Sequence, residues 1–383
     1  MLTPVLATED TKGNIVFLLP RETANTRAMA STSTETASAA TKMVLTPVTT
    51  LKDHEDYIRS MSYFPDGKRM VSASDDLTVR HWDLQTSKEI KEARDVCTWE
   101  VRVVMVSRDG RWVIVAGGDD DHAELKACEV ETGITKIFLG HSGEIKCIDT
   151  SSDGTLLASG SEDDTTRIWV FGTAKLMAGS FEGGCGAVRF SQDSKKLALY
   201  SNLGNSLDVW DVRTQKLQAG VQGKAPRGPV VTYAPVFWTS KGTIVAAFNF
   251  ADDGPMTIYE FDATSTLETV GASFKGHTEI INALALSSDD ALLSSASRDD
   301  TIKLWDFESR QLLASFHVQN PKILIFSPDS RKLAYTAAYE DDNNIYICNT
   351  PVDILTSIGG SAPEGQSTFP TVRLLTSAHV LSV

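Results

Sequence analysis

Residues 140–170 read GHSGEIKCIDTSSDGTLLASGSEDDTTRIWV, and the same register recurs at residues 53–83 and 276–306. In each copy a His lies 28 residues before a Trp, with a Ser ten and an Asp six residues before that Trp. The three sets are His54, Ser72, Asp76 and Trp82; His141, Ser159, Asp163 and Trp169; and His277, Ser295, Asp299 and Trp305. Four such positions recurring three times in one register predict an array of equal structural units. The length of 383 residues, which alone favours two or three domains, is then better read as one repeat domain.

Weaker copies of the unit are marked by the turn that precedes the second strand of each one. Along the chain these turns read FPDG, SRDG, SSDG, SQDS, TSKG, SSDD and FSPDS, about 40 to 48 residues apart. Short apolar runs such as WVIVAGG and TIVAAFN predict strands, because they are rich in residues that favour a pleated surface. Seven turns therefore predict seven units of four short strands. The first strands of the second, fourth, fifth and seventh units are expected to begin near Cys97, Cys185, Val230 and Pro321.

These residues and spacings resemble the WD-repeat β-propeller family over roughly residues 44–358. The resemblance implies an all-β fold, a seven-bladed propeller of four-stranded antiparallel blades. In that family the His lies in the loop entering the innermost strand, the Ser on the second strand, the Asp in the next turn and the Trp on the third strand. Each set would then form one buried hydrogen-bonded network. Three identical Ser, His and Asp trios indicate scaffolding rather than a catalytic triad, which is normally a single constellation.

The ring must close, because an open first or last blade would leave an unpaired strand edge. Residues 44–54, VLTPVTTLKDH, resemble the segments that precede the other two network His residues. We therefore predict that residues 44–51 form the outer strand of blade seven, with residues 353–358, DILTSI, as the competing segment. The predicted domains are a disordered or weakly ordered arm at 1–43, the propeller at 44–358 and a tail at 359–383.

Partners of the resembled family often dock on the rim that carries the loops into the inner strands and the turns between second and third strands. Strand alternation places the residues three and five after each network His on one side of the inner strand. The residue just before each network Asp lies on the same rim, and blade two contributes equivalent positions. Exposed aromatic and Arg side chains favour a contact surface, since such residues dominate binding energy at interfaces. The predicted partner-binding residues are Tyr57, Arg59, Asp75, Trp99, Glu100, Arg102, Glu144, Lys146, Glu162, Ile280, Asn282 and Arg298.

The chain is acidic, with 36 Lys and Arg against 50 Asp and Glu, a net charge of −14 and a pI near 5.0. This balance disfavours direct nucleic-acid binding. Much of the acidity falls in the turns between predicted second and third strands, which gives one acidic rim interrupted at blade four by SNLGNS. Such a rim favours a basic protein partner. The rim acids are Asp75, Asp76, Asp119, Asp120, Asp121, Glu162, Asp163, Asp164, Asp252, Asp253, Asp299, Asp300, Glu340, Asp341 and Asp342.

The sequence carries no Gly-rich phosphate loop, no HExxH and no GxSxG, and its five cysteines are scattered without metal-ligand spacing. We therefore expect no cofactor, no metal and no small-molecule substrate. The predicted inner strands are largely apolar, and Asp149 alone is no site, which disfavours a propeller enzyme or small-ligand receptor using the central channel. We expect a non-catalytic protein–protein interaction scaffold in a multiprotein complex, cytoplasmic or nuclear, neither secreted nor membrane-bound.

An alternative function rests on WDVR at residues 210–213, which resembles a short box found in WD-repeat substrate receptors of cullin-type ubiquitin ligases. The other blades that carry the Trp-Asp dipeptide read WDLQ and WDFE at the same position. The match is four residues long and the motif is promiscuous, so the ordinary end of a third strand is the favoured interpretation.

Overall fold

The computed structural model describes residues 7–9, 15–17, 44–94, 100–119, 121–182, 186–226, 231–232, 234–251, 254–264, 266–338 and 342–358. The chain forms two compact units, residues 1–41 and 42–383. In the first unit β1 (Ala7–Glu9) pairs antiparallel with β2 (Ile15–Phe17). The second unit holds all the other described strands and the helix α1. The domain boundaries after residues 43 and 358 stay predictions.

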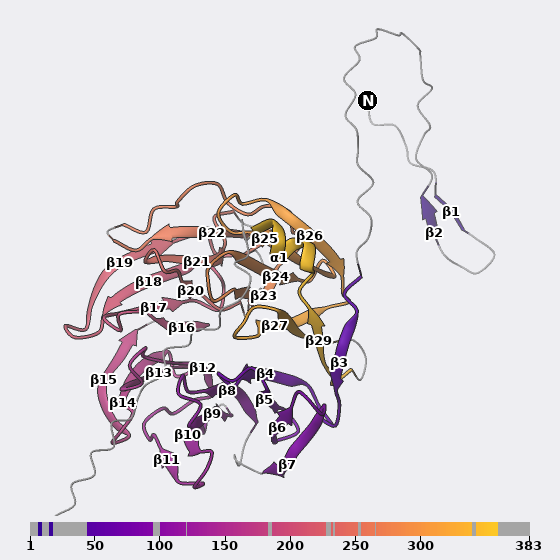
Figure 1. Cartoon of the computed structure of the whole chain (residues 1–383). Coiled ribbons are helices and arrows are strands. Elements are labelled where there is room, and N and C mark those ends of the chain that lie inside the picture. The colour runs from indigo at the N-terminus through magenta and orange to yellow at the C-terminus, as the bar shows by residue number, and fades with distance from the viewer. Residues whose placement is uncertain are drawn as a thin grey trace, which may run out of the picture. The chain divides into compact units, whose positions relative to one another are not determined.

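The second unit is a ring of seven antiparallel sheets, which confirms the predicted seven-bladed all-β propeller, and Figure 1 shows the blades arranged about a common centre. The first strands of neighbouring blades contact one another, except that blade five contacts blade six through β21 and β23, and β27 of blade seven contacts β4 of blade one. The first strands therefore form the inner wall of a closed ring. Turns between strands place Gly, Asp and Ser at positive φ, which Gly adopts without strain and short polar residues tolerate.

The first three blades each contain four strands. Blade one holds β4 (Ile58–Tyr63), β5 (Arg69–Ser74), β6 (Val79–Asp83) and β7 (Lys88–Arg94). Blade two holds β8 (Val101–Val106), β9 (Trp112–Gly118), β10 (Ala123–Glu129) and β11 (Thr135–Ile137). Blade three holds β12 (Ile145–Thr150), β13 (Leu156–Ser161), β14 (Thr165–Val170) and β15 (Lys175–Glu182).

The remaining blades follow the same order, with blade five reduced. Blade four holds β16 (Ala187–Phe190), β17 (Lys196–Tyr200), β18 (Ser206–Asp211) and β19 (Lys216–Gln222). Blade five holds β20 (Phe237–Trp238), β21 (Thr243–Phe248) and β22 (Thr257–Asp262). Blade six holds β23 (Ile281–Leu286), β24 (Leu292–Ser297), β25 (Thr301–Asp306) and β26 (Leu312–His317). Blade seven holds β27 (Pro321–Phe326), β28 (Lys332–Ala337), β29 (Ile345–Asn349) and β3 (Pro47–Leu51).

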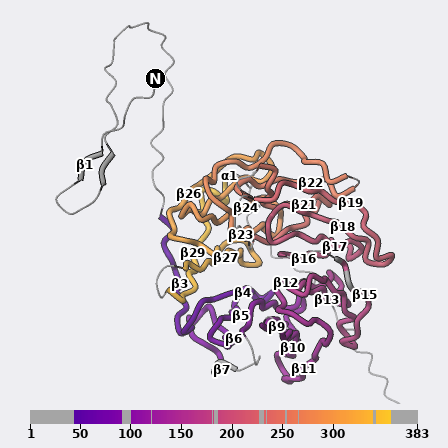
Figure 2. The backbone as a smooth tube through the Cα atoms, turned by 180° about the vertical axis from the view of Figure 1, so that it is seen from behind, coloured from indigo at the N-terminus to yellow at the C-terminus, as the bar shows by residue number. Residues whose placement is uncertain are grey.

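The N-terminal strand β3 closes the ring, as predicted. It pairs antiparallel with β29, with Thr50 opposite Tyr346, and Figure 2 shows it beside β29 from the other side of the molecule. Leu51 packs in one core cluster with Trp82 of blade one, so this strand also seals the junction between blades seven and one. The competing segment forms the helix α1 (Val352–Ile358), which buries Ile354 against blades six and seven.

Blade five departs from the four-stranded pattern. Its outer position is reduced to two isolated bridges, Ile258 with Phe274 and Phe261 with Thr269. Its inner strand starts at Phe237, whereas the sequence prediction began near Val230, which lies outside the described residues. The polar groups of Thr232 explain the shortening, because its amide donates to the Asn202 carbonyl at 2.8 Å and its hydroxyl to the Ile281 carbonyl at 2.8 Å. This segment therefore bonds to blades four and six instead of to its own sheet.

The residues expected to begin the second and fourth blades, Cys97 and Cys185, also lie outside the described residues, whereas β27 begins at Pro321 as predicted. In the part of the chain that the structure describes, no helix has the length and apolar character needed to span a bilayer.

Candidate functional site

The three repeated sets of residues form one hydrogen-bonded network in each of blades one, three and six. In blade three, His141 Nδ1 lies 2.8 Å from Asp163 Oδ2 and His141 Nε2 lies 2.8 Å from Ser159 Oγ. The Trp169 indole N–H donates to the same Ser159 Oγ at 2.9 Å. The matching contacts in the other two blades are His54 with Asp76 and Ser72, Trp82 with Ser72, His277 with Asp299 and Ser295, and Trp305 with Ser295.

Two further members of each network were missed in the sequence, although their spacing repeats. The Thr165 hydroxyl donates to Asp163 Oδ1 at 2.6 Å, and the Ser161 hydroxyl donates to the Gly143 carbonyl at 2.7 Å. A Thr two residues after the Asp and a Ser two residues before it occur in all three copies. The equivalent residues are Thr78, Ser74, Thr301 and Ser297.

Ionisation fixes the direction of the hydrogen bonds. Burial alone would raise the pKa of Asp163, but hydrogen bonds from Thr165 and His141 outweigh it and lower the pKa to about 2. Burial lowers the pKa of His141, so the ring is neutral near pH 7. The ionised Asp163 then accepts from Nδ1–H, which leaves Nε2 to accept from the Ser159 hydroxyl. The same Ser159 oxygen accepts the indole N–H, and because Ser159 is completely buried it is not accessible to a substrate.

Five inner strands carry a β-bulge at the same position, their second residue. The pairing register shifts there in β4, β8, β12, β23 and β27, so that one residue in each strand has no partner opposite it. Bulges re-aim the side chain of the extra residue and are common beside functional sites. We call the face of the ring on which these residues lie the entry face, because the loops entering the inner strands open onto it. The five bulge residues are Arg59, Arg102, Lys146, Asn282 and Lys322.

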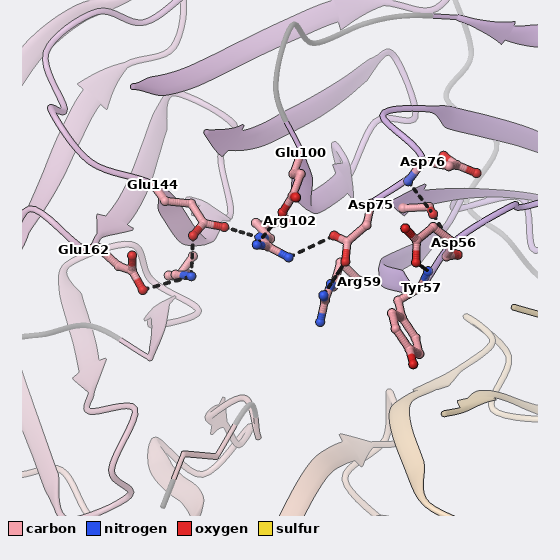
Figure 3. Close-up of polar contacts among 11 residues, drawn as sticks. Asp56, Tyr57, Arg59, Asp75, Asp76, Glu100, Arg102, Glu144 and Glu162 are labelled. Carbon is pink, nitrogen blue, oxygen red and sulfur yellow. Dashed lines mark hydrogen bonds and ion pairs between the residues drawn. The ribbon is translucent and has the colours of Figure 1, made fainter. Parts of the chain in front are cut away.

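A chain of ion pairs crosses the entry face from blade one to blade three, as Figure 3 shows. Arg102 lies at its centre and pairs with Asp75 of blade one at 2.9 Å, with Glu100 at 2.5 Å and with Glu144 of blade three. Asp75 also accepts from Arg59 Nε, at 2.7 Å. Charged groups of three blades are therefore held in one network.

Lys146 forms the other end of this chain. Its ammonium pairs with Glu144 at 2.5 Å and with Glu162 at 2.9 Å. Burial disfavours the charged form of Lys146, but the hydrogen bonds to the two carboxylates outweigh it and raise the pKa of the amine. The acids at the centre of the chain are buried, with side chains of Glu144 and Asp75 only 6% and 8% exposed, whereas Glu162 and Glu100 are each 46% exposed.

The other predicted contact residues divide into exposed and buried positions. Tyr57 is 45% exposed, and the Arg59 guanidinium lies 5.7 Å from the centre of its ring. Ile280 and Asn282 are buried, so their side chains are not presented at the surface. Arg298 is exposed and donates to the Val231 carbonyl at 2.9 Å and to Asn282 Oδ1 at 3.3 Å. Trp99 lies outside the described residues.

The predicted acidic rim is smaller in the structure than in the sequence. Asp76, Asp163 and Asp299 are internal members of the networks, and Asp75 belongs to the ion-pair chain. Asp300 accepts from the Asn320 amide and Asp342 from the Tyr346 hydroxyl. Asp119 is half-buried and contacts His122, so among the described rim acids the exposed ones are Asp121, Glu162 and Asp164 on blades two and three. The positions that lie outside the description are Asp120, Asp252, Asp253, Glu340 and Asp341.

The buried Asp149 and the WDVR segment are the two features that could suggest a channel site or a ubiquitin-ligase box. Asp149 on β12 is buried and pairs with Arg189 of blade four at 3.1 Å. In the WDVR segment Arg213 is exposed beyond the end of β18, while Val212 is buried. Within the described ranges, no group of three or more His, Cys, Asp or Glu side chains could hold a metal ion.

Comparison with known proteins identifies the repeats. Residues 45–83, 133–170 and 268–306 match the family model described as WD domain, G-beta repeat. Each of these three segments contains the His, Ser, Asp and Trp of one complete network.

Curated relatives align over parts of their length. The chain is 28% identical over 202 residues to eukaryotic translation initiation factor 3 subunit I of Mycosarcoma maydis, covering 48% of this chain and 56% of that protein. It is 24% identical over 336 residues to apoptotic protease-activating factor 1 of Rattus norvegicus, covering 75% and 26%. It is 31% identical over 134 residues to a guanine nucleotide-binding protein subunit beta of Zea mays, covering 32% and 35%. The alignments thus span between about a quarter and just over half of these relatives.

Proposed function

This chain is a WD-repeat β-propeller, and we propose that it is a non-catalytic protein–protein interaction scaffold within a multiprotein complex. The observation that carries the proposal is the entry face, where five bulged inner strands aim polar side chains from five blades to one side of the ring. Two of the relatives above are named as subunits, which supports a place in an assembly.

The proposed contact surface is the exposed part of the entry face. Tyr57 offers an aromatic ring beside a guanidinium, the combination that most often carries binding energy in protein interfaces. The ion-pair chain behind it holds Arg59 and Arg102 in fixed positions, so a partner would meet a surface ordered before binding. The exposed residues of this surface are Tyr57, Arg59, Glu162 and Arg298, and Glu100 and Lys146 are half-buried beside them.

The charge of the surface supports a partner segment that is basic where it crosses blades two and three. Asp121, Glu162 and Asp164 are exposed there. Opposite charges across an interface increase the association rate and fix the register of the partner. Added salt is expected to weaken binding through screening, because these acids are exposed to solvent.

A scaffold role also fits the interior chemistry. The Ser, His and Asp trios are buried and tie strands of one blade together, and the carboxylate of Asp149 is occupied by Arg189. We extend the proposal to a cytoplasmic or nuclear location, where such complexes assemble.

The test is purification of the complex from the protein's own cells with the full chain carrying a tag. We expect Tyr57→Ala with Arg59→Ala to lose partners, at a cost of about 2 kcal/mol or more for an aromatic and Arg pair. The matched control is Lys216→Ala with Leu217→Ala, which changes an exposed cation and an exposed apolar side chain on blade four away from the entry face. Recovery of the same partners by both double variants would reject the entry face as the contact surface.

A further inference from the structure

Lys322 occupies the bulge position of blade seven and differs from the other basic bulge residues in its surroundings. It lies five residues after His317, the same spacing that separates Arg59 from His54, so the sequence carried a signal for it. Its side chain is half-buried. Within the described part of the chain, its ammonium makes no ion pair with a carboxylate, whereas Arg102 contacts three carboxylates and Lys146 contacts two.

The charges around Lys322 have its own sign. Burial is the main factor that lowers the pKa of Lys322, followed by the positive charges of Arg298 and Arg59. The geometry agrees, because Arg298 donates to Asn282 and Asn282 donates to the carbonyl of Pro321, the neighbour of Lys322, at 3.2 Å. Arg59 lies on β4, which contacts β27.

Within the described residues, neither Lys322 nor Arg298 forms an ion pair with a carboxylate. The described partners of the Arg298 side chain are the neutral oxygens of Val231 and Asn282. Arg59 pairs with Asp75, but Asp75 is shared with Arg102. Asp75 thus contacts two guanidinium groups, of which that of Arg102 also pairs with Glu100 and Glu144, and none of the described carboxylates pairs with Lys322. The same backbone position that is neutralised in blades two and three therefore has no carboxylate partner in blade seven among the described residues.

We propose that Lys322, with Arg298 and Arg59, forms an acceptor site for an Asp or Glu side chain of the protein partner. The inference rests on the scaffold function proposed above and specifies the chemistry of part of its contact surface. A single carboxylate supplies the one charge that the site lacks. A phosphate dianion fits less well, because it would meet the carboxylate of Asp75, which lies between Arg59 and Arg102. The partner segment would then be acidic over blades six and seven and basic over blades two and three, which fixes its direction across the ring.

The probe for this site is a fluorescein-labelled hexaglutamate peptide, with hexaglutamine as its uncharged match. Binding to the full-length protein is measured by fluorescence anisotropy at low ionic strength. The net charge of −14 repels an acidic peptide in general, so hexaglutamate binding would require a local positive site. We expect hexaglutamate to bind, and hexaglutamine not to bind.

The decisive variant is Lys322→Gln, which removes the charge and keeps a polar side chain. We expect it to weaken hexaglutamate binding by about tenfold or more, or roughly 1.4 kcal/mol. The control is Lys195→Gln, which removes a charge from an exposed amine on the turn after β16 and should leave the affinity within about twofold. Equal thermal unfolding of the three proteins would show that all are folded; if Lys322→Gln unfolds, Lys322→Arg replaces it and should retain binding.

Equal affinity of the wild type and Lys322→Gln for hexaglutamate would overturn the proposal, as would equal binding of hexaglutamate and hexaglutamine. Tighter binding of a phosphoserine peptide with glutamine on both sides than of hexaglutamate would also overturn it. The scaffold function is tested separately, by the partner purification described above. Suppose that Tyr57→Ala with Arg59→Ala loses its partners, while Lys322→Gln binds hexaglutamate as tightly as the wild type. The scaffold function is then supported and the carboxylate site is wrong.

Discussion

The hydroxyl group of Ser159 connects the polar side chains of blade three. It donates to the neutral His141 ring and accepts the indole N–H of Trp169, so one small side chain satisfies two buried ring nitrogens. An unsatisfied buried polar group costs more than an average hydrogen bond contributes, which explains why Ser recurs at this position in all three complete networks.

We predict that Ser159→Ala lowers the free energy of unfolding by about 1–3 kcal/mol, because it leaves the indole N–H without its acceptor and His141 Nε2 without its donor. Urea unfolding at neutral pH measures the change. Ser152→Ala is a matched control in the same blade, since the buried Ser152 hydroxyl has no hydrogen-bond partner among the described residues. The interpretation fails if both variants have the same effect.

The network acids also predict a pH dependence. The pKa of Asp163 is about 2 in the fold, below the value of about 3.9 for an unfolded Asp. A depressed native pKa stabilises the fold above the unfolded pKa, and this stabilisation is lost as pH falls from about 4 through the native value of about 2. The pKa values of Asp76 and Asp299 are lowered in the same direction.

Asp163→Asn tests this contribution. We expect the variant to be less stable than the wild type at pH 7, by about 1–2 kcal/mol, and the difference to shrink between about pH 4 and pH 2. Thermal or urea unfolding across this range gives the measurement. A difference that stays constant with pH would show that the ionised carboxylate is not what stabilises the network.

Between blades, a buried ion pair joins strands where the repeated networks are missing. Asp149 of β12 accepts from Arg189 at 3.1 Å and from the Phe190 amide at 2.7 Å. Arg189 also donates to the Val236 carbonyl at 3.2 Å and lies 5.1 Å from the centre of the Phe237 ring. Blades four and five lack the complete His network, and this cluster links both of them to blade three.

Asp149→Ala should therefore destabilise the ring. Removing one partner of a fully buried pair costs about 3–5 kcal/mol, and we expect about 2 kcal/mol or more here because Arg189 keeps partial contact with solvent. Glu308→Ala is the control, since it breaks the exposed pair with Lys241 and should change stability by less than about 1 kcal/mol. Urea unfolding compares the two, and similar losses would argue against a special role of the buried pair.

For the whole molecule, stability depends on joining the two ends of the ring. β3 supplies the last strand of blade seven, and Leu51 packs against both blade seven and blade one. Without it, β29 would become an exposed edge, which is prone to pair with other chains.

We predict that a chain beginning at Lys52 has a melting temperature lower by about ten degrees or more and aggregates on heating, because it loses a strand and its core contacts. A chain beginning at Val44 keeps β3 and should melt within a few degrees of the full-length protein. Differential scanning calorimetry compares the two truncations, and an unchanged melting temperature for the shorter chain would contradict the role of β3 in closure.

The sequence by itself left two candidate segments for the closing strand, but it determined the repeat, the number of blades and the His, Ser, Asp and Trp members of the three networks. These features depend on spacing along the chain, and the same spacing produces the same local hydrogen bonds in each blade. Even the missed Thr and Ser partners, such as Thr165 and Ser161, were present at fixed distances from the network Asp.

Only the tertiary structure decided which charges remain available on the entry face. Whether an acid is exposed depends on side chains from neighbouring blades, which lie about 40 residues away in the sequence. Asp75 and Glu144 are neutralised by Arg102, Ile280 and Asn282 are buried, and Lys322 is left without a described carboxylate partner. The bulk acidity of the sequence therefore did not predict a positive site on blade seven, because burial and ion pairing between blades are set by the folded ring.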